Sequence, residues 1–464
     1  MHYPASDLVI DPVLIRTYDT AGPRYTSYPT ADRFVEAFGE ADFRQWLAKR
    51  NLGGIGLPLS AYVHLPFCDT VCYYCACNKV ATRDRGKSAK YINYLEKELA
   101  LAGPLLGPDR DLCRLHWGGG TPTFLSRAEM SALMAALRRE LRFAPQCECS
   151  IEVDPRRMQA GTLAFLAGLG FNRVSFGVQD FDPAVQKAVN RIQSEEITRQ
   201  AVEEARASGF RSVNVDLIYG LPKQTLDGFN RTLDKVIALA PERIALYAYA
   251  HLPRLFAPQR RIAEADLPSA ESKLQILSLA IGRLTRAGWL YIGMDHFARP
   301  EDALATAQAQ GRLQRDFQGY SAQPESDTLG LGVSAIGRVG PTYYQNCKRL
   351  EDYYAALDAG RLPVARGIEL TSDDLVRRAV IQALMCQFRV SIESIELGHL
   401  IDFRKYFAAE LADLRRLSAD GLVELDGDWV VVTPKGRLLV RVVSMVFDRY
   451  LRERTARASY SKVI

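Results

Sequence analysis

One pattern recurs between residue 60 and about residue 295. A short β-branched or aromatic run is followed by a loop with Gly, Pro or a polar residue, and then by an amphipathic helical segment. Strands that alternate with helices in this way predict parallel βα units. Six such units without a return strand predict an α/β fold, an incomplete (β/α)6-type barrel with its chemistry on the loops after the strands. The strand-like runs are residues 61–67, 112–117, 149–155, 173–178, 212–220 and 243–250, with a further candidate at 289–294.

Two of the intervening helices carry clear start signals. SRAEMSALMAALRREL begins at Ser126 and has Glu129 three residues later, which is a capping box. SEEITRQAVEEARASG begins at Ser194 with acidic residues in its first turn and stops at Gly209. These signals predict helices between the strands, as the βα pattern requires.

Changes in the residue pattern along the sequence divide the chain into three parts. We expect an irregular N-terminal arm over residues 1–55, the partial barrel with its extension over 56–350, and a mainly helical, winged-helix-like domain over 351–464. In the last part, TSDDLVRRAVIQALMCQF and AAELADLRRLSADG predict helices. LVELDGDWVVVTPKG predicts a hairpin that turns near Asp426 and Gly427, with a final helix over 435–452.

Composition places the chain among globular enzymes. Its 464 residues are 48% hydrophobic and 24% charged, and no stretch approaches the length of a membrane span. The start, MHYPASDLVIDPVLI, lacks the features of a signal peptide, so we expect a cytoplasmic protein. We also expect a monomer. The net charge of +5 permits an acidic substrate or a nucleic acid but requires neither.

Four of the nine cysteines lie in one stretch of ten residues, CDTVCYYCAC, at positions 68–77. The other five are scattered, which in a reducing compartment argues against a disulfide framework and for metal or redox chemistry at the cluster. A structural zinc site is the alternative, but zinc sites usually pair two distant C-x2-C knuckles, and no second knuckle is present. Cys68, Cys72 and Cys75 can instead hold three corners of a [4Fe–4S] cube and leave the fourth iron open to a ligand.

Polar residues interrupt or follow the apolar runs at positions that suit an active site. Glu152 and Asp216 lie within strand-like runs, and Gly118-Gly119-Gly120 and Gln179 follow the ends of two others. A carboxylate in an apolar strand usually points at a ligand or a partner charge, because burying it alone is costly. The placements predict one site at the mouth of the barrel.

The motifs in which these residues lie resemble the radical S-adenosylmethionine (SAM) superfamily, through the C-x3-C-x2-C loop after the first strand. Within it, the chain resembles the family of oxygen-independent coproporphyrinogen III oxidases, in order from residue 24 to about residue 350. The segments that carry the likeness are RYTSYPTA, YVHLPFC, the added Cys77 with Asn78 and Lys79, HWGGGTPT, EVDPR, GVQDFD, VNVDLIYGLP, GMDHFARP and FQGYSAQ.

The resemblance implies a reaction. A [4Fe–4S] cluster on Cys68, Cys72 and Cys75 would bind SAM and cleave it with one electron to a 5′-deoxyadenosyl radical. The radical would take a hydrogen from the β-carbon of a propionate, and loss of carbon dioxide and an electron would leave a vinyl group. When two propionates react in this way, coproporphyrinogen III becomes protoporphyrinogen IX in haem biosynthesis. An electron donor and a final acceptor, both unidentified, are required.

The resemblance also implies two SAM molecules per chain. It assigns the SAM on the cluster to Tyr62, Gly119, Glu152 and the backbone of Ile336, and it places Tyr74 near the adenine. Tyr74 and Ala76 depart from the more usual Phe and Gly, for which we expect altered affinity at most. The positions that match the second SAM site are Gly120, Thr121, Gln179, Arg191, Asp216 and Ala250.

Three further interpretations stay open at the level of sequence. His64 either contacts the cluster or SAM or is structural, and Arg24 and Arg299 are candidates for substrate carboxylates with an ordinary surface role as the alternative. A related haem-trafficking chaperone shares the cysteine loop but usually lacks the RYTSYPT arm. A winged-helix DNA-binding regulator is disfavoured, because Arg415 and Arg416 stand beside three acidic residues in the candidate helix, so we expect no nucleic acid partner.

Overall fold

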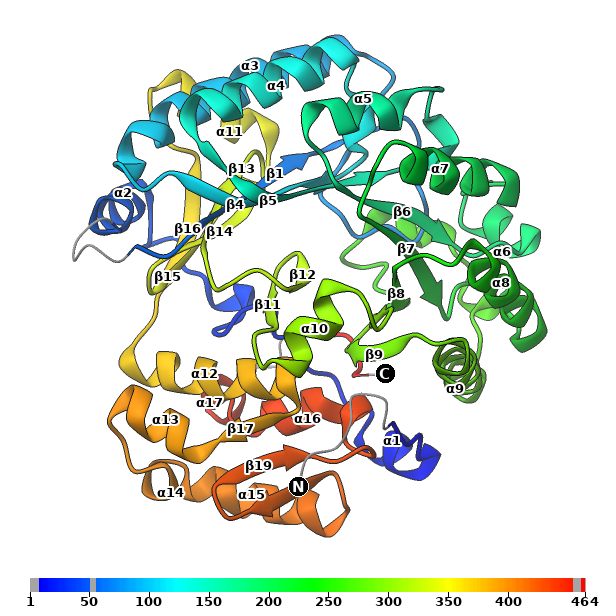
Figure 1. The fold of residues 1–464 in the computed structure, drawn as a ribbon, viewed down its shortest axis with the longest axis vertical. Helices are drawn as coiled ribbons and strands as arrows, with labels where there is room; N and C mark the ends of the chain where they lie inside the picture. Colours follow the sequence, from blue (N-terminus) through cyan, green and yellow to red (C-terminus); the bar gives the residue numbers. More distant parts are fainter. Residues whose placement is uncertain (1–7, 51–55, 454–459, 464) are drawn as a thin grey trace. The chain divides into compact units, whose positions relative to one another are not determined.

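The computed structural model describes residues 8–50, 56–453 and 460–463, and predictions that fall on the remaining residues lie outside the described part. The chain divides into two compact units (Figure 1). The sheet unit comprises Phe34–Pro268 and Glu325–Glu369. The terminal unit comprises Met1–Arg33, Ser269–Pro324 and Leu370–Ile464. The first 55 residues are therefore shared between the two units.

The sheet unit contains the predicted parallel strands. Its strands follow the order β16-β15-β14-β13-β1-β4-β5-β6-β7-β8, and every neighbouring pair from β1 through β8 is parallel. This confirms the α/β fold predicted from the six strand-like runs. The six strands are β1 (Leu59–Leu65), β4 (Asp111–Gly119), β5 (Arg142–Val153), β6 (Arg173–Gln179), β7 (Ser212–Tyr219) and β8 (Arg243–Ala248).

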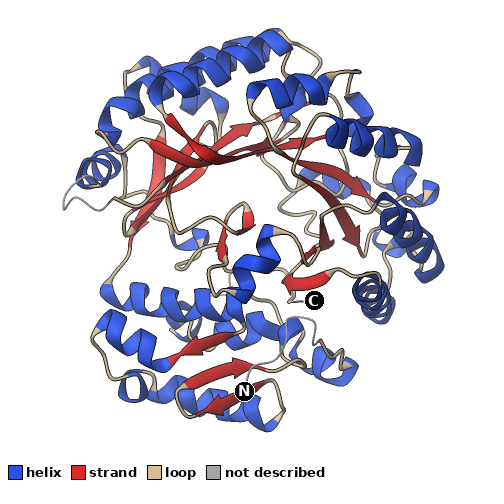
Figure 2. Cartoon of the chain, in the orientation of Figure 1, coloured by secondary structure: helices blue, strands red, loops and turns tan. Residues whose placement is uncertain are grey.

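Helices between these strands cover one face of the sheet (Figures 1 and 2). The capping box at Ser126 and Glu129 is present, and the Ser194 side chain accepts a hydrogen bond from the Ile197 amide, so both predicted helix starts are confirmed. The helices are α3 (Gly86–Ala102), α4 (Arg127–Glu140), α5 (Thr162–Leu169), α6 (Pro183–Ala188), α7 (Glu195–Ala207) and α8 (Leu226–Leu239), with short 3-10 turns at Gly103–Leu106, Pro122–Phe124 and Pro155–Arg157.

The two faces of the sheet differ because successive strand residues point in opposite directions. Leu115, Trp117 and Ile151 are fully buried, and the register of β4 and β5 places them on the same face of the sheet. Their neighbours His116 and Glu152 point the other way and stay partly accessible. We call this second side the polar face.

Four strands beside β1 extend the sheet in a way that the sequence pattern did not reveal. β13 (Asp327–Leu331) runs parallel to β1, and β14 (Ile336–Val339), β15 (Thr342–Asn346) and β16 (Val364–Glu369) follow as antiparallel neighbours. Glycines weaken the β signal of the first two strands. At Gly330, for example, a side chain would meet the backbone of β14, since a Cβ there would lie 2.6 Å from the Ile336 carbonyl oxygen.

Two helices correct the prediction of an irregular arm over residues 1–55. α1 (Pro12–Tyr18) begins at Asp11, whose carboxylate accepts from the amides of Val13 and Leu14. α2 (Glu40–Lys49) belongs to the sheet unit and begins where Asp42 caps the Gly39 amide at 2.9 Å. Both helices are short, so they show little periodicity in the sequence. In the sheet unit, α11 (Leu350–Asp358) follows β15.

The terminal unit is mainly helical, as predicted for the C-terminal region (Figure 2). The predicted hairpin is confirmed, with β18 (Val423–Asp426) antiparallel to β19 (Trp429–Val432) and β17 (Arg389–Ser391) on its other side. The remaining elements are α9 (Ala270–Arg286), β9 (Leu290–Gly293), β10 (His296–Ala298), α10 (Ala303–Ala309), β11 (Gln314–Asp316), β12 (Gly319–Ser321), α12 (Ser372–Gln387), α13 (Ile392–His399), α14 (Phe403–Tyr406), α15 (Ala408–Ala419), α16 (Val440–Met445) and α17 (Arg449–Arg452).

Two details of the terminal unit differ from the sequence prediction. The single helix expected over 435–452 is broken into a 3-10 turn, α16 and α17, because Asp448 turns out of the helix and caps the amide of Tyr450 at 3.0 Å. The candidate strand at 289–294 forms β9, but it pairs antiparallel with β10. Within the described part of the chain, no helix has the length and apolar character needed to cross a membrane.

A buried arginine joins the two ends of the chain within the terminal unit. Arg441 is 2% exposed, and its guanidinium donates to the carbonyl oxygens of Gly22, Pro23 and Lys462. Tyr25 adds a hydrogen bond of 3.0 Å from its hydroxyl to the Asp448 carboxylate. The N-terminal segment is therefore held by residues near the C-terminus.

A buried carboxylate plays the corresponding role in the sheet unit. Glu98 on α3 accepts hydrogen bonds from the Gly332 amide at 2.8 Å, the Asn346 amide group at 2.7 Å and the Tyr353 hydroxyl at 2.6 Å. It joins α3 to β15, to α11 and to the loop after β13. Burial raises the pKa of Glu98 to about 7, although the three donors lower it.

This pKa predicts a pH-dependent contribution of Glu98 to stability. Between about pH 4.5 and pH 7 the folded chain keeps a proton that the unfolded chain has lost, so the free energy of unfolding falls as the pH rises. The Glu98→Gln variant does not titrate there. The stability of the wild type minus that of the variant should therefore fall between pH 5 and pH 7, by up to about 1.4 kcal/mol per pH unit.

Urea denaturation at several pH values measures this difference. Glu96→Gln on the same helix is the control for loss of one carboxylate from α3. A difference between wild type and Glu98→Gln that stays constant or rises with pH would contradict the raised pKa.

Candidate active site

The cysteine loop begins at the carboxyl end of β1 and is closed by a short parallel pairing. β2 (Phe67–Cys68) pairs with β3 (Val80–Ala81), and the Val80 amide donates to the Pro66 carbonyl oxygen at 2.7 Å. The Thr82 amide donates to the Cys68 carbonyl oxygen at 2.9 Å. The loop therefore starts at β2 and returns to it through β3.

The glycines after β4 let this loop lie close to the sheet. A Cβ on Gly119 would lie 2.5 Å from the His64 ring, and one on Gly120 would lie 2.7 Å from the Phe67 carbonyl oxygen. Gly119 also has a φ of +110°, which side chains rarely allow. With no side chain in the way, the amides of Gly120 and Thr121 donate to carbonyl oxygens of Leu65 and Phe67, both at 2.8 Å.

Polar groups surround the thiols of the loop. The Thr121 hydroxyl lies 3.6 Å from the Cys68 sulfur, and Arg156 and Arg191 lie 3.6 and 3.7 Å from the Cys72 sulfur. Cys75 has its pKa lowered to about 6, chiefly by a hydrogen bond from the Cys77 thiol. Burial raises the pKa of Cys68 to about 11.

The three predicted cluster ligands fit a [4Fe–4S] group. All are free cysteines on one loop, and the guanidiniums of Arg156 and Arg191 lie beside the Cys72 sulfur. Among the described residues, no group of three His, Cys, Asp or Glu side chains is arranged to hold a single metal ion. A cube needs no such common point, since each of its irons takes one thiolate.

The residues predicted for the SAM on the cluster lie on or beside the polar face. The Tyr62 hydroxyl is 2.9 Å from His64 Nδ1, and the Tyr62 ring stacks on His116 with centroids 5.8 Å apart. Glu152 accepts from the Gly119 amide at 3.2 Å and faces His116 Nε2 at 3.3 Å.

These contacts fix the state of two residues. Burial by itself raises the pKa of Glu152, but the interactions with His116 and the Gly119 amide lower it by more. The net pKa is therefore lowered, and Glu152 stays a carboxylate. The His64 ring forms a hydrogen bond through each nitrogen, one with the Tyr62 hydroxyl and one with the Asn78 carbonyl oxygen. Burial lowers the pKa of His64. Ile336 begins β14, two strands from Tyr62 in the sheet.

Three residues predicted for a second SAM meet on β6 and β7. Gln179 ends β6 at a β-bulge with a φ of 69°, which is uncommon for a residue with a side chain and typical of functional sites. Arg191 donates to the Gly177 carbonyl oxygen at 2.5 Å, and Gly177 pairs with Asp216. Burial raises the pKa of Asp216 to about 6.

The sequence did not single out Gln259 or Asp154. Gln259 is 1% exposed and donates to the carbonyl oxygens of Tyr74 at 3.0 Å and Ala250 at 3.2 Å, which joins two predicted SAM residues. Asp154 accepts from Arg156 at 2.6 Å and from Arg191 at 3.3 Å. The EVDPR segment was a signal for Asp154 and Arg156, whereas Gln259 lies in a stretch with no motif.

The two arginines considered for substrate carboxylates have partners inside the terminal unit. Arg24 lies 3.2 Å from the Asp295 carboxylate. Arg299 stacks on Trp289, 3.4 Å from the ring centroid, and donates to the Ala287 carbonyl oxygen. Arg299 is therefore already held by two contacts within the terminal unit.

Comparison with known proteins agrees with this geometry. The radical SAM superfamily model matches residues 62–236, which include the cysteine loop, and the HemN C-terminal domain model matches residues 370–439. Oxygen-independent coproporphyrinogen III oxidases of Pseudomonas aeruginosa and Escherichia coli strain K12 are 52% and 49% identical to this chain. Each alignment covers 98% of both sequences.

A solved structure is similar over nearly the whole chain. It is described as "Coproporphyrinogen III oxidase (HemN) from Escherichia coli is a Radical SAM enzyme", with a TM-score of 0.91 and 48% identity over 96% of this chain and 100% of the other. Identity at this level extends over nearly the whole chain. The chain therefore belongs to the oxygen-independent coproporphyrinogen III oxidases of the radical SAM superfamily.

Proposed function

We propose that this chain catalyses the oxygen-independent oxidative decarboxylation of two propionate side chains of coproporphyrinogen III to vinyl groups, giving protoporphyrinogen IX in haem biosynthesis. The observation that carries the proposal is the loop of three free thiols, at the carboxyl end of β1 beside the polar face. When bound, the [4Fe–4S] cluster and SAM supply an electron and a carbon radical that removes hydrogen from the substrate.

The chain itself positions these groups and controls their surroundings. We assign the iron ligands to Cys68, Cys72 and Cys75. Arg156 and Arg191 place positive charge beside the Cys72 sulfur. With the cluster bound, these two guanidiniums would stabilise the negative charge that one-electron reduction adds.

The polar face is suited to an amino acid with a charged amine. Glu152 is held as a carboxylate by His116 and the Gly119 amide, so it can accept from the SAM amine or ribose hydroxyls. The glycines after β4 leave room for backbone to approach the ligand closely. Tyr62, Gly119, Glu152 and the backbone of Ile336 form the proposed first SAM site, with Tyr74 near the adenine.

A second SAM site on β6, β7 and their loops remains part of the proposal. Its support is the group formed by the strained Gln179, Arg191 and Asp216. Arg191 contacts the Cys72 sulfur and Thr121 contacts the Cys68 sulfur, so both lie against the cysteine loop. Ala250 completes the set, because Gln259 donates to the carbonyl oxygens of both Ala250 and Tyr74. We expect a separate electron donor and acceptor, and a monomeric enzyme in the cytoplasm.

The activity is tested with anaerobic, iron- and sulfide-reconstituted protein, dithionite, SAM, coproporphyrinogen III and cell extract as acceptor. We expect loss of two carbon dioxide units per tetrapyrrole by mass spectrometry, with 5′-deoxyadenosine formed in step. Cleavage of SAM with the tetrapyrrole unchanged would contradict the oxidase and favour a haem-trafficking role.

Two serine variants test the cluster ligands. Cys72→Ser should lose the cluster, because it removes one of three thiolates, whereas Cys77→Ser should retain about four iron atoms per chain. Iron and sulfide analysis with visible absorption measures this after identical reconstitution. Equal loss in the two variants would show that Cys77 is a ligand and that the assignment of three is wrong.

Asp216→Ala tests the second SAM site. Equilibrium binding to cluster-loaded protein should show two SAM molecules per wild-type chain and one per variant chain, because the carboxylate on β7 belongs only to the second site. Glu203→Ala on the exposed side of α7 is the control. One SAM per chain in both proteins would remove the second site from the proposal.

A further inference from the structure

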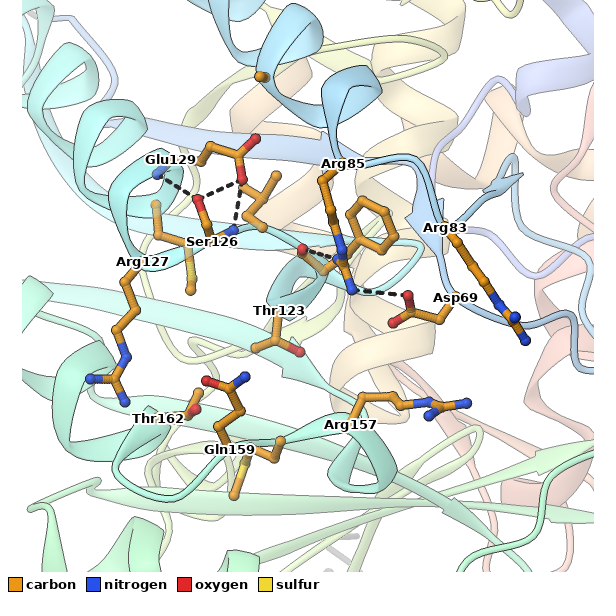
Figure 3. Close-up of a pocket in the computed structure, with 15 residues that line it drawn as sticks. Asp69, Arg83, Arg85, Thr123, Ser126, Arg127, Glu129, Arg157, Gln159 and Thr162 are labelled. Atoms are coloured by element: carbon orange, nitrogen blue, oxygen red, sulfur yellow. Dashed lines mark hydrogen bonds and ion pairs between the residues drawn. The ribbon is translucent and has the colours of Figure 1, made fainter.

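A pocket of about 850 Å³ lies beside the start of the cysteine loop, where Asp69 lines it together with residues at helix starts (Figure 3). Its walls come from the loop at Asp69, the segment before α3, and the amino ends of α4 and α5 at Arg127 and Thr162. None of the residues proposed above to bind the cluster or SAM lines it. The pocket is thus separate from the polar face.

The pocket is rich in arginine. Arg85 is turned toward Asp69 at 3.0 Å, and Arg127 donates to the Ala160 carbonyl oxygen at 3.2 Å. Arg83 and Arg157 are exposed, and within the described residues their side chains make no hydrogen bond or ion pair; Figure 3 draws them with no dashed contact. The positive charge therefore exceeds what the pocket itself neutralises.

The remaining acid lowers this positive charge without cancelling it. Glu129 accepts from Ser126 in the capping box and from the Ser88 hydroxyl at 2.8 Å. The four arginines that line the pocket still outnumber its two acidic residues, Asp69 and Glu129. The amino ends of α4 and α5 add partial positive charge from their helix dipoles. Thr123 lines the same pocket, and its hydroxyl is buried with no hydrogen-bond partner in the described structure. The surroundings favour an anion.

Three residues of the pocket lie one or two positions along the sequence from a cluster thiol or from a residue that contacts one. Asp69 follows the ligand Cys68 directly. Thr123 lies two residues after Thr121, which contacts the Cys68 sulfur at 3.6 Å, and Arg157 follows Arg156, which contacts the Cys72 sulfur at 3.6 Å. A partner held in this pocket would therefore lie against the outer side of the cluster loop.

The anionic substrate is not the occupant that this position suits. The residues proposed to hold SAM, such as Tyr62 on β1 and Glu152 on β5, do not line the pocket, whose walls are loop residues and helix starts. A substrate must meet SAM, but an electron need only reach the iron. The position and the charge together suit a donor of electrons.

We propose that this arginine pocket, defined by Asp69, Arg83, Thr123, Arg127 and Arg157, docks the acidic surface of the protein that reduces the cluster. Exposed, unpaired guanidiniums at its rim suit a carboxylate-rich protein face and steer its approach. In each encounter the carrier loses one electron, the cluster gains it, and no atoms are transferred. The inference rests on the cluster site proposed above.

The test compares two reductants on cluster-loaded protein under anaerobic conditions. A reduced plant-type ferredoxin, an acidic one-electron carrier of low potential, is the protein probe, and dithionite is the small reductant that needs no docking. The variant is Arg83→Glu with Arg157→Glu. The matched control is Arg139→Glu with Arg211→Glu, which reverses two exposed arginines near the other end of the sheet unit's strands.

Stopped-flow absorbance gives the rate constant for cluster reduction, and calorimetry gives the affinity for oxidised ferredoxin at low and high salt. We expect the pocket variant to lose about tenfold or more in rate constant and in affinity at low salt. In the wild type, the rate constant and the affinity for ferredoxin should fall in the same way as the salt concentration is raised. Reduction by dithionite and iron content should match in all three proteins, and the control variant should behave as wild type.

Three outcomes would overturn the proposal. Equal ferredoxin rates in the pocket variant and the control would show that the pocket does not dock the carrier. Inhibition of the dithionite-driven reaction by inorganic phosphate, at constant ionic strength, in wild type but not in the pocket variant would assign the pocket to a small anion. Failure of dithionite to reduce the wild-type protein would overturn the cluster site, and the docking site with it.

Discussion

The close approach of the β4 glycines to the end of β1 is the constraint on which the rest of the site depends. Two backbone hydrogen bonds, from Gly120 to Leu65 and from Thr121 to Phe67, hold the start of the cysteine loop against the sheet. A Cβ on Gly120 would collide with the Pro66 and Phe67 backbone and push the loop outward. Because Thr121 contacts Cys68 and Gly119 contacts Glu152, this one junction positions both the thiols and the polar face.

The alternation of side chains along the strands then separates two kinds of chemistry. Residues such as Trp117 and Ile151 pack under the helices and supply the core. Their immediate neighbours, His116 and Glu152, form a hydrogen-bonded pair on the opposite face. A shift of one residue in the register of β4 or β5 would exchange these roles, so the apolar core also specifies where the polar side chains of these strands point.

The sequence revealed those parts of the molecule whose signals are local. The six parallel strands, the cap at Ser126 and the hairpin at Asp426 each follow from periodicity or from capping chemistry within a few residues. The strands β13–β16 escaped notice because glycine occupies positions such as Gly330, where the reason lies in a neighbouring strand. Gln259 escaped for a similar reason, since its two acceptors, Tyr74 and Ala250, are remote in the sequence or unmarked by any motif.

The terminal unit has a consequence for how the protein is made. Its first segment is held by Arg441 and Asp448, which are synthesised more than four hundred residues later. Until those residues leave the ribosome, the carbonyl oxygens of Gly22 and Pro23 lack their buried partner, while most of the sheet unit has already emerged. The segment around Gly22 and Pro23 therefore reaches its final place only after residue 441 has left the ribosome, so formation of the terminal unit reports that the sheet unit has already been synthesised.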